Sequence, residues 1–164
     1  MDRKASMAPV GAADARLLLL GSLPGDASLA AQRYYAHPTN QFWRLLGAAL
    51  GEELATLAYD ARLMRLAARG VALWDVVERA ERAGSLDGAI RNVSANALAD
   101  YVATHPRLAA VGFNGQTAAR LGRRALGEMR LTLIDLPSSS AAFTMQVTDK
   151  AARWQVLAVF ADRA

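Results

Sequence analysis

The sequence predicts an α/β fold, in which strands of a parallel sheet alternate with helices. Four short apolar segments are each followed by turn or capping residues, as expected of buried strands: Arg16–Ser22, Gly70–Val76, Leu108–Phe113 and Leu131–Leu136. Segments with helical spacing of apolar residues lie between them. Because strands separated by helix-length connections run parallel and are joined by right-handed crossovers, we expect an open α/β sheet.

The first strand is predicted from the run of four leucines at Leu17–Leu20. This run is far too short to span a membrane, which takes about 20 residues. The preceding residues 1–14 lack the apolar core of a signal peptide. We therefore expect a mobile tail at residues 1–14, a single domain at residues 15–164, and no association with a membrane.

Helices are expected in five segments: Phe42–Leu50, Ala58–Ala68, Ala95–Thr104, Gln116–Leu126 and Thr148–Phe160. In each, apolar residues recur on one side at helical spacing. Thr148 is the expected N-cap of the last helix, and Trp154 belongs to its apolar stripe. A polar, glycine-containing loop is expected at Glu81–Gly88.

The composition narrows the function classes. The chain has 19 Lys plus Arg and 15 Asp plus Glu, a net charge of +4 that permits a polyanionic partner without requiring one. It has no cysteine, which excludes disulfides and thiolate-held clusters. Its two histidines, His37 and His105, make a zinc site improbable. We expect no metal, no cofactor, a monomer and a cytoplasmic location.

Four segments should meet at the carboxyl ends of the strands, where open α/β sheets bind ligands: Gly21–Gly25, Trp74–Asp75, Phe113–Gly115 and Pro137–Ser140. The first allows a tight turn whose amides suit a phosphate or a base carbonyl. An ordinary strand-ending turn explains the same residues. The last offers hydroxyls and amides for phosphates and continues to an apolar tip that could enter a duplex. A polar loop that caps the next helix is its alternative reading.

Aromatic and polar side chains are densest at Tyr34–Trp43. Aromatic faces stack on bases, and an Asn amide can hydrogen-bond a base edge or hold a water molecule. A purely structural reading is available for several members. Phe42 and Trp43 begin a helix and should face the core, Asn40 would then be its N-cap, and His37 would serve a structural hydrogen bond.

Charged residues near the strand ends leave two readings open. Asp75 could orient a water molecule or pair with an arginine. Arg79, Arg82 and Arg91 could contact phosphates or form a solvated face.

Taken together, these segments resemble the uracil-DNA glycosylase superfamily, and most of all its hypoxanthine-DNA glycosylase branch. That branch shows the patterns Gly-Ser-x-Pro-Gly, Tyr-Tyr-x-x-Pro-x-Asn-x-Phe-Trp, Leu-Trp-Asp, Gly-Ser-Leu-Asp, Phe-Asn-Gly and Leu-Pro-Ser-x-Ser. They stand here, in the same order, as Gly21–Gly25, Tyr34–Trp43, Leu73–Asp75, Gly84–Asp87, Phe113–Gly115 and Leu136–Ser140. The resemblance covers roughly residues 16–160.

The resemblance implies a three-layer α/β/α sandwich around a four-stranded parallel sheet, and base flipping into a pocket at the strand ends. It places the catalytic amide at Asn40. The superfamily's first motif carries a catalytic Asn in mismatch-specific uracil enzymes, and Leu23 occupies that position here. The common His of the last motif is missing, and Phe143 and Thr144 depart from the usual continuation of that motif.

We therefore expect a cofactor-free, monofunctional DNA glycosylase of base excision repair. It would flip and hydrolyse deaminated bases, hypoxanthine in preference and uracil second, and leave an abasic site. The oxygen of Asn40 could position water and its nitrogen could donate a hydrogen bond. The expected base contacts are Ser22, Leu23, Gly25, Tyr35 and Asn114, and the expected DNA contacts are Ser138, Ser139, Ser140 and Phe143.

Two other readings come from different classes. A catalytically inactive DNA- or nucleotide-binding module of the same fold is motivated by Leu23. A small-molecule α/β hydrolase would need a Ser–His–acid arrangement that the sequence does not show in a recognisable context.

Overall fold

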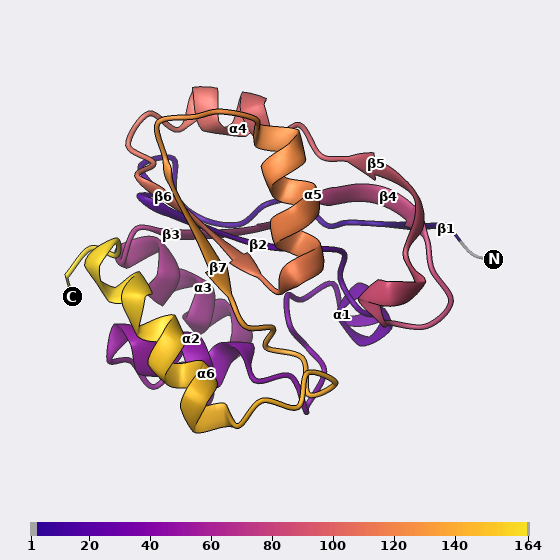
Figure 1. The fold of residues 1–164 in the computed structure, drawn as a ribbon. Coiled ribbons are helices and arrows are strands. Elements are labelled where there is room, and N and C mark those ends of the chain that lie inside the picture. Colours follow the sequence, from indigo (N-terminus) through magenta and orange to yellow (C-terminus); the bar gives the residue numbers. More distant parts are fainter. Residues whose placement is uncertain (1–2, 164) are drawn as a thin grey trace.

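The computed structural model describes residues 3–163 and has a four-stranded parallel sheet at its centre (Figure 1). The strands lie in the order β3-β2-β6-β7, with β2 at Leu17–Gly21, β3 at Val71–Asp75, β6 at Ala110–Asn114 and β7 at Thr132–Leu136. All three pairings are parallel. The predicted fold class is confirmed, and each predicted strand is found within two residues of its expected start.

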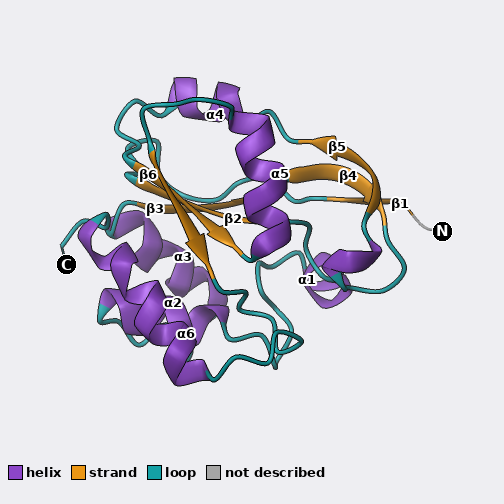
Figure 2. Ribbon diagram, viewed as in Figure 1, coloured by secondary structure: helices purple, strands orange, loops and turns teal. Residues whose placement is uncertain are grey.

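Helices cover both faces of this sheet (Figure 2). One face carries α2 (Phe42–Leu50), α3 (Tyr59–Ala68) and α6 (Val147–Trp154), and the other carries α4 (Leu98–Thr104) and α5 (Gln116–Leu126). The leucines of β2 divide between the two layers, since side chains alternate along a strand. Leu17 and Leu19 pack in the first core and Leu18 and Leu20 in the second.

The last helix is shorter than predicted. It ends at Trp154 and continues as a 3₁₀ segment, η2, at Gln155–Val159. Gln146, not Thr148, takes the N-cap position, and no side chain caps this end. Trp154 is fully buried in the core, as expected.

A second, antiparallel sheet of three strands adjoins the first and was not predicted. Its order is β1-β4-β5, with β1 at Arg3–Ala5, β4 at Val77–Glu81 and β5 at Arg91–Ala95. Every residue of β5 is exposed, so this strand carries no apolar alternation by which a sequence pattern could reveal it. The short helix α1 at Asp26–Ala31 and the 3₁₀ turn η1 at Asp87–Ala89 were also not predicted.

The start of the chain is structured where a mobile tail is expected from the sequence. Strand β1 pairs with β4, and Val10 forms an isolated bridge with Leu73. The Lys4 ammonium donates to Asp26 Oδ1 at 2.6 Å and to the Gly84 carbonyl at 2.5 Å. Arg3–Ala5 therefore join the second sheet and Val10 contacts β3 of the parallel sheet, while Met1 and Asp2 lie outside the described residues.

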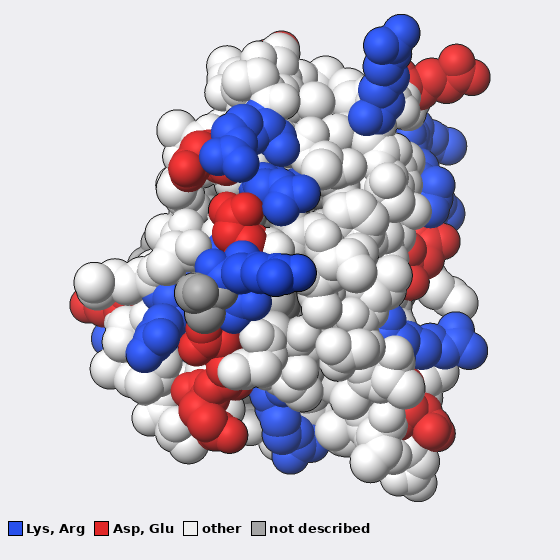
Figure 3. All heavy atoms as spheres, turned by 90° about the vertical axis from the view of Figure 1, so that its left-hand side faces the viewer, with Lys and Arg blue, Asp and Glu red and all other residues white. Residues whose placement is uncertain are grey.

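Charges of both signs are interspersed on the face around the C-terminal end of the chain (Figure 3). Glu52 pairs there with Arg65 and Arg69, and Asp162 pairs with Arg16. This face therefore presents no patch of one sign to a polyanion. None of the described helices is long and apolar enough to cross a membrane.

Candidate active site

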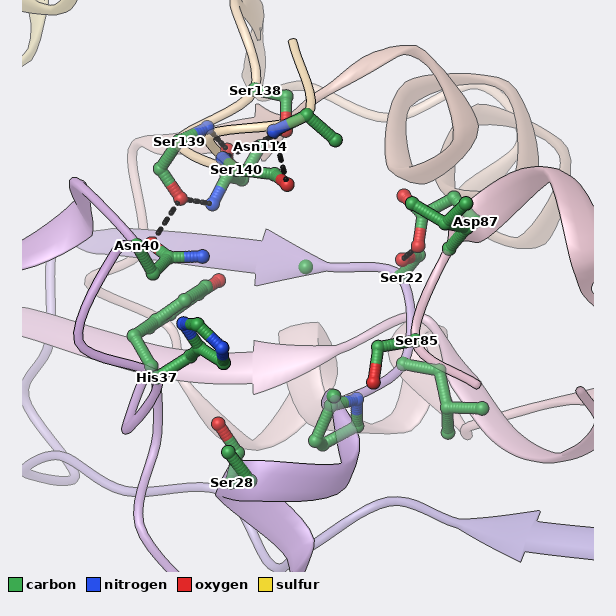
Figure 4. A pocket seen from close by; sticks show the side chains of 18 of the residues that line it. Ser22, Ser28, His37, Asn40, Ser85, Asp87, Asn114, Ser138, Ser139 and Ser140 are labelled. Carbon is green, nitrogen blue, oxygen red and sulfur yellow. Dashed lines mark hydrogen bonds between the residues drawn. The ribbon is translucent and has the colours of Figure 1, made fainter. Parts of the chain in front are cut away.

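A pocket of about 300 Å³ opens at the carboxyl ends of the parallel strands. The loops after β2 and β7, the last residues of β3 and β6, the loop between β4 and β5 and the aromatic segment before α2 all contribute to its walls. Figure 4 shows these segments facing one another. The residues predicted to bind a base, together with Asn40 and the three serines, all line this pocket: Ser22, Leu23, Gly25, Tyr35, Asn40, Asn114, Ser138, Ser139 and Ser140.

The side-chain amide of Asn40 has one fixed orientation. Its oxygen accepts two hydrogen bonds, from the Phe42 N–H at 2.9 Å and from the Ser139 hydroxyl at 2.8 Å. Rotating the amide by 180° would replace both acceptor contacts with an NH₂ group facing two donors. The amide nitrogen therefore points into the pocket, as Figure 4 shows. Gln41, not Asn40, takes the N-cap position of α2, so the contact of Asn40 with the Phe42 N–H lies one residue before the cap. The catalytic role of Asn40 stays a prediction.

Hydrogen bonds among Ser139, Asn114 and Asn40 hold the Asn40 amide in this orientation. The Asn114 amide nitrogen donates to the Ser139 hydroxyl at 2.8 Å, and the Ser139 N–H donates to the Asn114 amide oxygen at 2.8 Å. The Ser139 hydroxyl then donates to Asn40, which completes a directed chain of hydrogen bonds. The backbone adds a further contact, from the Gln41 N–H to the Ser139 carbonyl at 2.9 Å.

These hydrogen bonds exclude the predicted DNA contact by the Ser139 hydroxyl. The side chain is buried and its hydroxyl is used within the protein, so it cannot be one of the hydroxyls that contact DNA. Asn114 uses one donor and one acceptor of its amide on Ser139, and it keeps one of each for a ligand. Its predicted base contact stays a prediction.

The neighbouring serines are better placed for DNA. The Ser138 hydroxyl oxygen accepts from the Ser140 N–H, and the Ser140 hydroxyl oxygen accepts from the Ala142 N–H. Each hydroxyl uses its oxygen in the loop and retains its O–H for an outside acceptor such as a phosphate. Phe143 follows on the same loop and is 41% exposed.

Lys150 holds the loop of Ser138–Ser140 from the protein interior. It is fully buried and donates to Gln41 Oε1 at 2.9 Å and to the Ser140 carbonyl at 3.1 Å. Its ammonium also lies 5.3 Å from the centre of the Phe143 ring. Burial lowers the pKa of this lysine. Lys150 thus ties the segment of Asn40 to the serine loop, a role that the sequence analysis did not identify.

The loop after β2 is held by two side chains of the connection between β4 and β5, Arg82 and Asp87. Asp87 Oδ1 accepts a hydrogen bond from the Ser22 hydroxyl at 2.6 Å. The buried Arg82 guanidinium donates to the carbonyls of Leu23 at 3.2 Å and Pro24 at 2.5 Å. Burial lowers the pKa of Arg82 and raises that of Asp87. Arg82 is therefore neither a phosphate contact nor part of a solvated face, the two roles considered for it.

Leu23 and Gly25 contribute to the pocket mainly through their backbone. The Leu23 side chain is buried against Val77, Ala80 and Ile90, so its apolar character serves packing between the two sheets. The carbonyls of this loop are turned toward protein donors. Its amides are then the groups left to meet a ligand, in agreement with the expectation from the tight turn.

The ring of Tyr35 is held in place by parallel stacking on a core aromatic side chain. Its ring stacks on Phe42 with centroids 3.8 Å apart and planes 11° apart. Its backbone has a φ of 55°, in the left-handed region that a tyrosine rarely adopts. Such a conformation persists when the surroundings enforce it, and it is common at functional sites.

Tyr35 and Asp75 form the floor of the pocket beside Gly21. A Cβ atom added at Gly21 would lie 2.6 Å from Asp75 Oδ1 and 2.9 Å from the Tyr35 hydroxyl, so only glycine fits between them. Among the described residues, Asp75 Oδ2 and the Tyr35 hydroxyl are the two buried side-chain atoms without a hydrogen-bond partner. Burial, reinforced by the charge of Asp87, raises the pKa of Asp75 to about 7.

The remaining candidates have ordinary roles. His37 Nδ1 contacts the N–H of Thr39 at 3.1 Å and its hydroxyl at 2.9 Å, a local structural contact at the pocket rim. Arg91 donates to the carbonyls of Gly88 and Ile90, whereas Arg79 is exposed. No group of three or more potential metal ligands is found within residues 3–163.

Comparison with known proteins agrees with this geometry. Residues 8–162 match the family model described as the uracil DNA glycosylase superfamily. A protein of Methanosarcina acetivorans named hypoxanthine DNA glycosylase is 36% identical over 141 residues, which cover 86% of this chain and 89% of the relative. One of the same name from Methanosarcina barkeri is 35% identical over 154 residues, covering 93% and 96%.

The solved structures include a similar fold. A solution NMR structure of a protein from Methanosarcina acetivorans, described as a candidate uracil DNA glycosylase, superimposes with a TM-score of 0.83 at 34% sequence identity. The match covers 95% of this chain and 96% of that one. The resemblance read from the ordered motifs is therefore confirmed.

Proposed function

Because the chain belongs to the uracil-DNA glycosylase superfamily, we propose that it is a monofunctional DNA glycosylase that removes deaminated bases, hypoxanthine above all. The observation that carries the proposal is the Asn40 amide, locked by two donors with its nitrogen toward the pocket. A preorganised donor of this kind supplies transition-state stabilisation without having to reorganise during the reaction.

The reaction breaks the N-glycosidic bond as the sugar gains oxocarbenium character. The Asn40 oxygen accepts from Phe42 and Ser139 and is therefore not free to position water, as considered from the sequence. The Asn40 nitrogen can donate to the departing base, on which negative charge develops. Water adds to the anomeric carbon through its oxygen and loses a proton, the base leaves with the bonding pair, and uptake of one proton by the base balances the hydrolysis. No lysine lines the pocket among the described residues, so an imine with the sugar has no nucleophile and an abasic site is the expected product.

Base choice follows from the walls of the pocket. Tyr35 offers one ring face, since Phe42 covers the other, and a flipped purine can stack there. Hypoxanthine presents an acceptor at O6 beside a donor at N1, which the remaining donor and acceptor of Asn114 can match. Adenine presents the opposite pattern and would leave these groups unpaired. We expect the protein to act as a cytoplasmic monomer on DNA with deaminated bases.

The deciding experiment is single-turnover excision from duplexes with inosine or deoxyuridine opposite each of the four bases. We expect hypoxanthine to be released faster than uracil, and inosine mispairs to react fastest because they open more easily. Faster release of uracil throughout would contradict the base assignment and leave the glycosylase assignment intact. Tight binding of both duplexes without excision would favour the inactive binding module.

The stacking role of Tyr35 gives a separate prediction. Replacement by Ala should cost about 1–3 kcal/mol of transition-state binding, the usual range for stacking of a base on an aromatic ring. Replacement by Phe should be mild, because the Tyr35 hydroxyl has no partner among the described residues. The single-turnover rate of excision from the inosine duplex is measured for both variants. A large loss in Tyr35→Phe would assign the role to the hydroxyl instead.

A further inference from the structure

The loop between β4 and β5 places an apolar side chain at the rim of the pocket. Large apolar side chains that remain exposed among the described residues are Met64, Leu86, Val93, Phe143, Val156 and Val159. Of these, Leu86 lines the pocket and is 63% exposed. A single exposed leucine on a surface needs no explanation. Whether Leu86 has a role therefore depends on how firmly the surrounding backbone holds it in place.

The two neighbours of Leu86 are both fastened to the segment that follows β2. The Ser85 hydroxyl accepts from the Asp26 N–H at 2.9 Å, and Asp87 accepts from the Ser22 hydroxyl at 2.6 Å. The Leu86 carbonyl accepts from the Ala89 N–H and starts a 3₁₀ turn. The backbone on either side of Leu86 is therefore held, while its side chain stays outside.

The base of the same loop is clamped as well. Arg82 donates to the Gly84 carbonyl at 2.8 Å in addition to the loop after β2, and Lys4 donates to that carbonyl from β1. Gly84 itself turns the chain with a φ of 71°. The exposure of Leu86 is thus a fixed feature of the rim.

The loop on the opposite side of the pocket carries a second exposed apolar side chain, Phe143, just beyond the lining residues Ala141 and Ala142. Figure 4 shows Ser85 across the pocket from Ser138, Ser139 and Ser140. Phe143 follows those serines, and the Lys150 ammonium lies 5.3 Å from the centre of its ring. A base that leaves a duplex opens a gap in the stack, and enzymes that unstack DNA insert apolar side chains at such steps. The pocket accordingly lies between two loops, each of which carries an exposed apolar side chain that a bent duplex can meet.

We propose that Leu86 is a duplex wedge, which inserts into the base stack beside the flipped nucleotide from the rim opposite Phe143. The proposal rests on the proposed glycosylase function. A wedge acts on stacking, so it matters for a duplex and has no task on a single strand, whose bases are already free to unstack. The ratio of duplex to single-strand excision therefore isolates it from the chemistry at Asn40.

The test compares wild type, Leu86→Ala and Val159→Ala in single-turnover excision of hypoxanthine from duplex and single-stranded DNA. Val159 is 71% exposed in η2 and does not line the pocket, which makes it the matched control. Leu86→Ala should lower the duplex rate about 10-fold or more and leave the single-strand rate and the melting temperature unchanged. Equal rates of Leu86→Ala and wild type on the duplex would overturn the proposal, as would equal losses on both substrates.

A binding readout separates this proposal from the proposed function. A duplex with a tetrahydrofuran abasic analogue and 2-aminopurine as the neighbouring base needs no excision. Wild type and Val159→Ala should raise the 2-aminopurine fluorescence by unstacking it, and Leu86→Ala should raise it much less. If the wild-type protein excises neither hypoxanthine nor uracil, the proposed function fails. The fluorescence measurement still decides the role of Leu86 in that case. The same rise in all three proteins would contradict the wedge.

Discussion

Asn40→Ala is expected to lower single-turnover excision of hypoxanthine by about 100-fold or more, the loss seen when a key transition-state donor is removed. The substitution removes the nitrogen that faces the pocket and leaves the walls in place. Binding of an abasic product duplex should change little. Near-wild-type excision by this variant would end the assignment of Asn40 as the catalytic amide.

Two further variants identify which atom of the amide acts. Asn40→Asp keeps an oxygen for the Phe42 N–H and the Ser139 hydroxyl but replaces the nitrogen by a second oxygen. We expect a loss close to that of the Ala variant. Excision at or above the wild-type rate would show that an oxygen activates water instead. Ser139→Ala removes one of the two contacts that fix the amide, so its loss should be intermediate.

Asp75→Asn is expected to stabilise the protein at pH 8 by about 2–4 kcal/mol, because it removes a charge that the folded state buries. The carboxyl has a pKa of about 7 in the folded protein, against an ordinary value of 3.8. Between these two values the folded state holds a proton that the unfolded state has released. Wild-type stability therefore falls as the pH rises through this window, and the loss is complete above the folded pKa.

Urea unfolding between pH 4 and pH 8 measures this effect. The advantage of Asp75→Asn should be small near pH 4, where the carboxyl is protonated in the folded state and close to half-protonated in the unfolded state. Asp14→Asn, at a side chain 64% exposed, is the control for replacing a surface carboxylate by an amide. A loss of stability in Asp75→Asn at pH 8 would mean that attraction to Arg82, which lowers the pKa, outweighs burial.

The parallel sheet could be predicted because its strands carry their own signal. Leu17–Leu20 is apolar at every position, as a strand buried on both faces must be. Strand β5 gives no such signal, since all of its side chains are exposed and its place depends on pairing with β4. The second sheet is thus determined by tertiary contacts and not by local periodicity.

The candidate site could be predicted as a set of segments but not as a hydrogen-bond network. Asn40 and Ser139 are 99 positions apart, and only the fold shows that the serine faces inward to the amide. Arg82 and Lys150 look like surface cations in the sequence, yet both are buried and hold loops. The motif at Gly84–Asp87 was visible, but its role depends on contacts with Ser22 and Asp26.

Strand β1 supports the loop between β4 and β5, whose residues Ser85–Asp87 line the pocket. A shortened version that begins at Ala15 would lose the ammonium of Lys4, which joins Asp26 to Gly84. It would also leave β4 with an unpaired edge, an open template on which copies could associate. Purification tags and fusion partners attached at this end would stand beside Asp26 and Gly84, close to the loop that carries Leu86, so the other terminus is the better place for them.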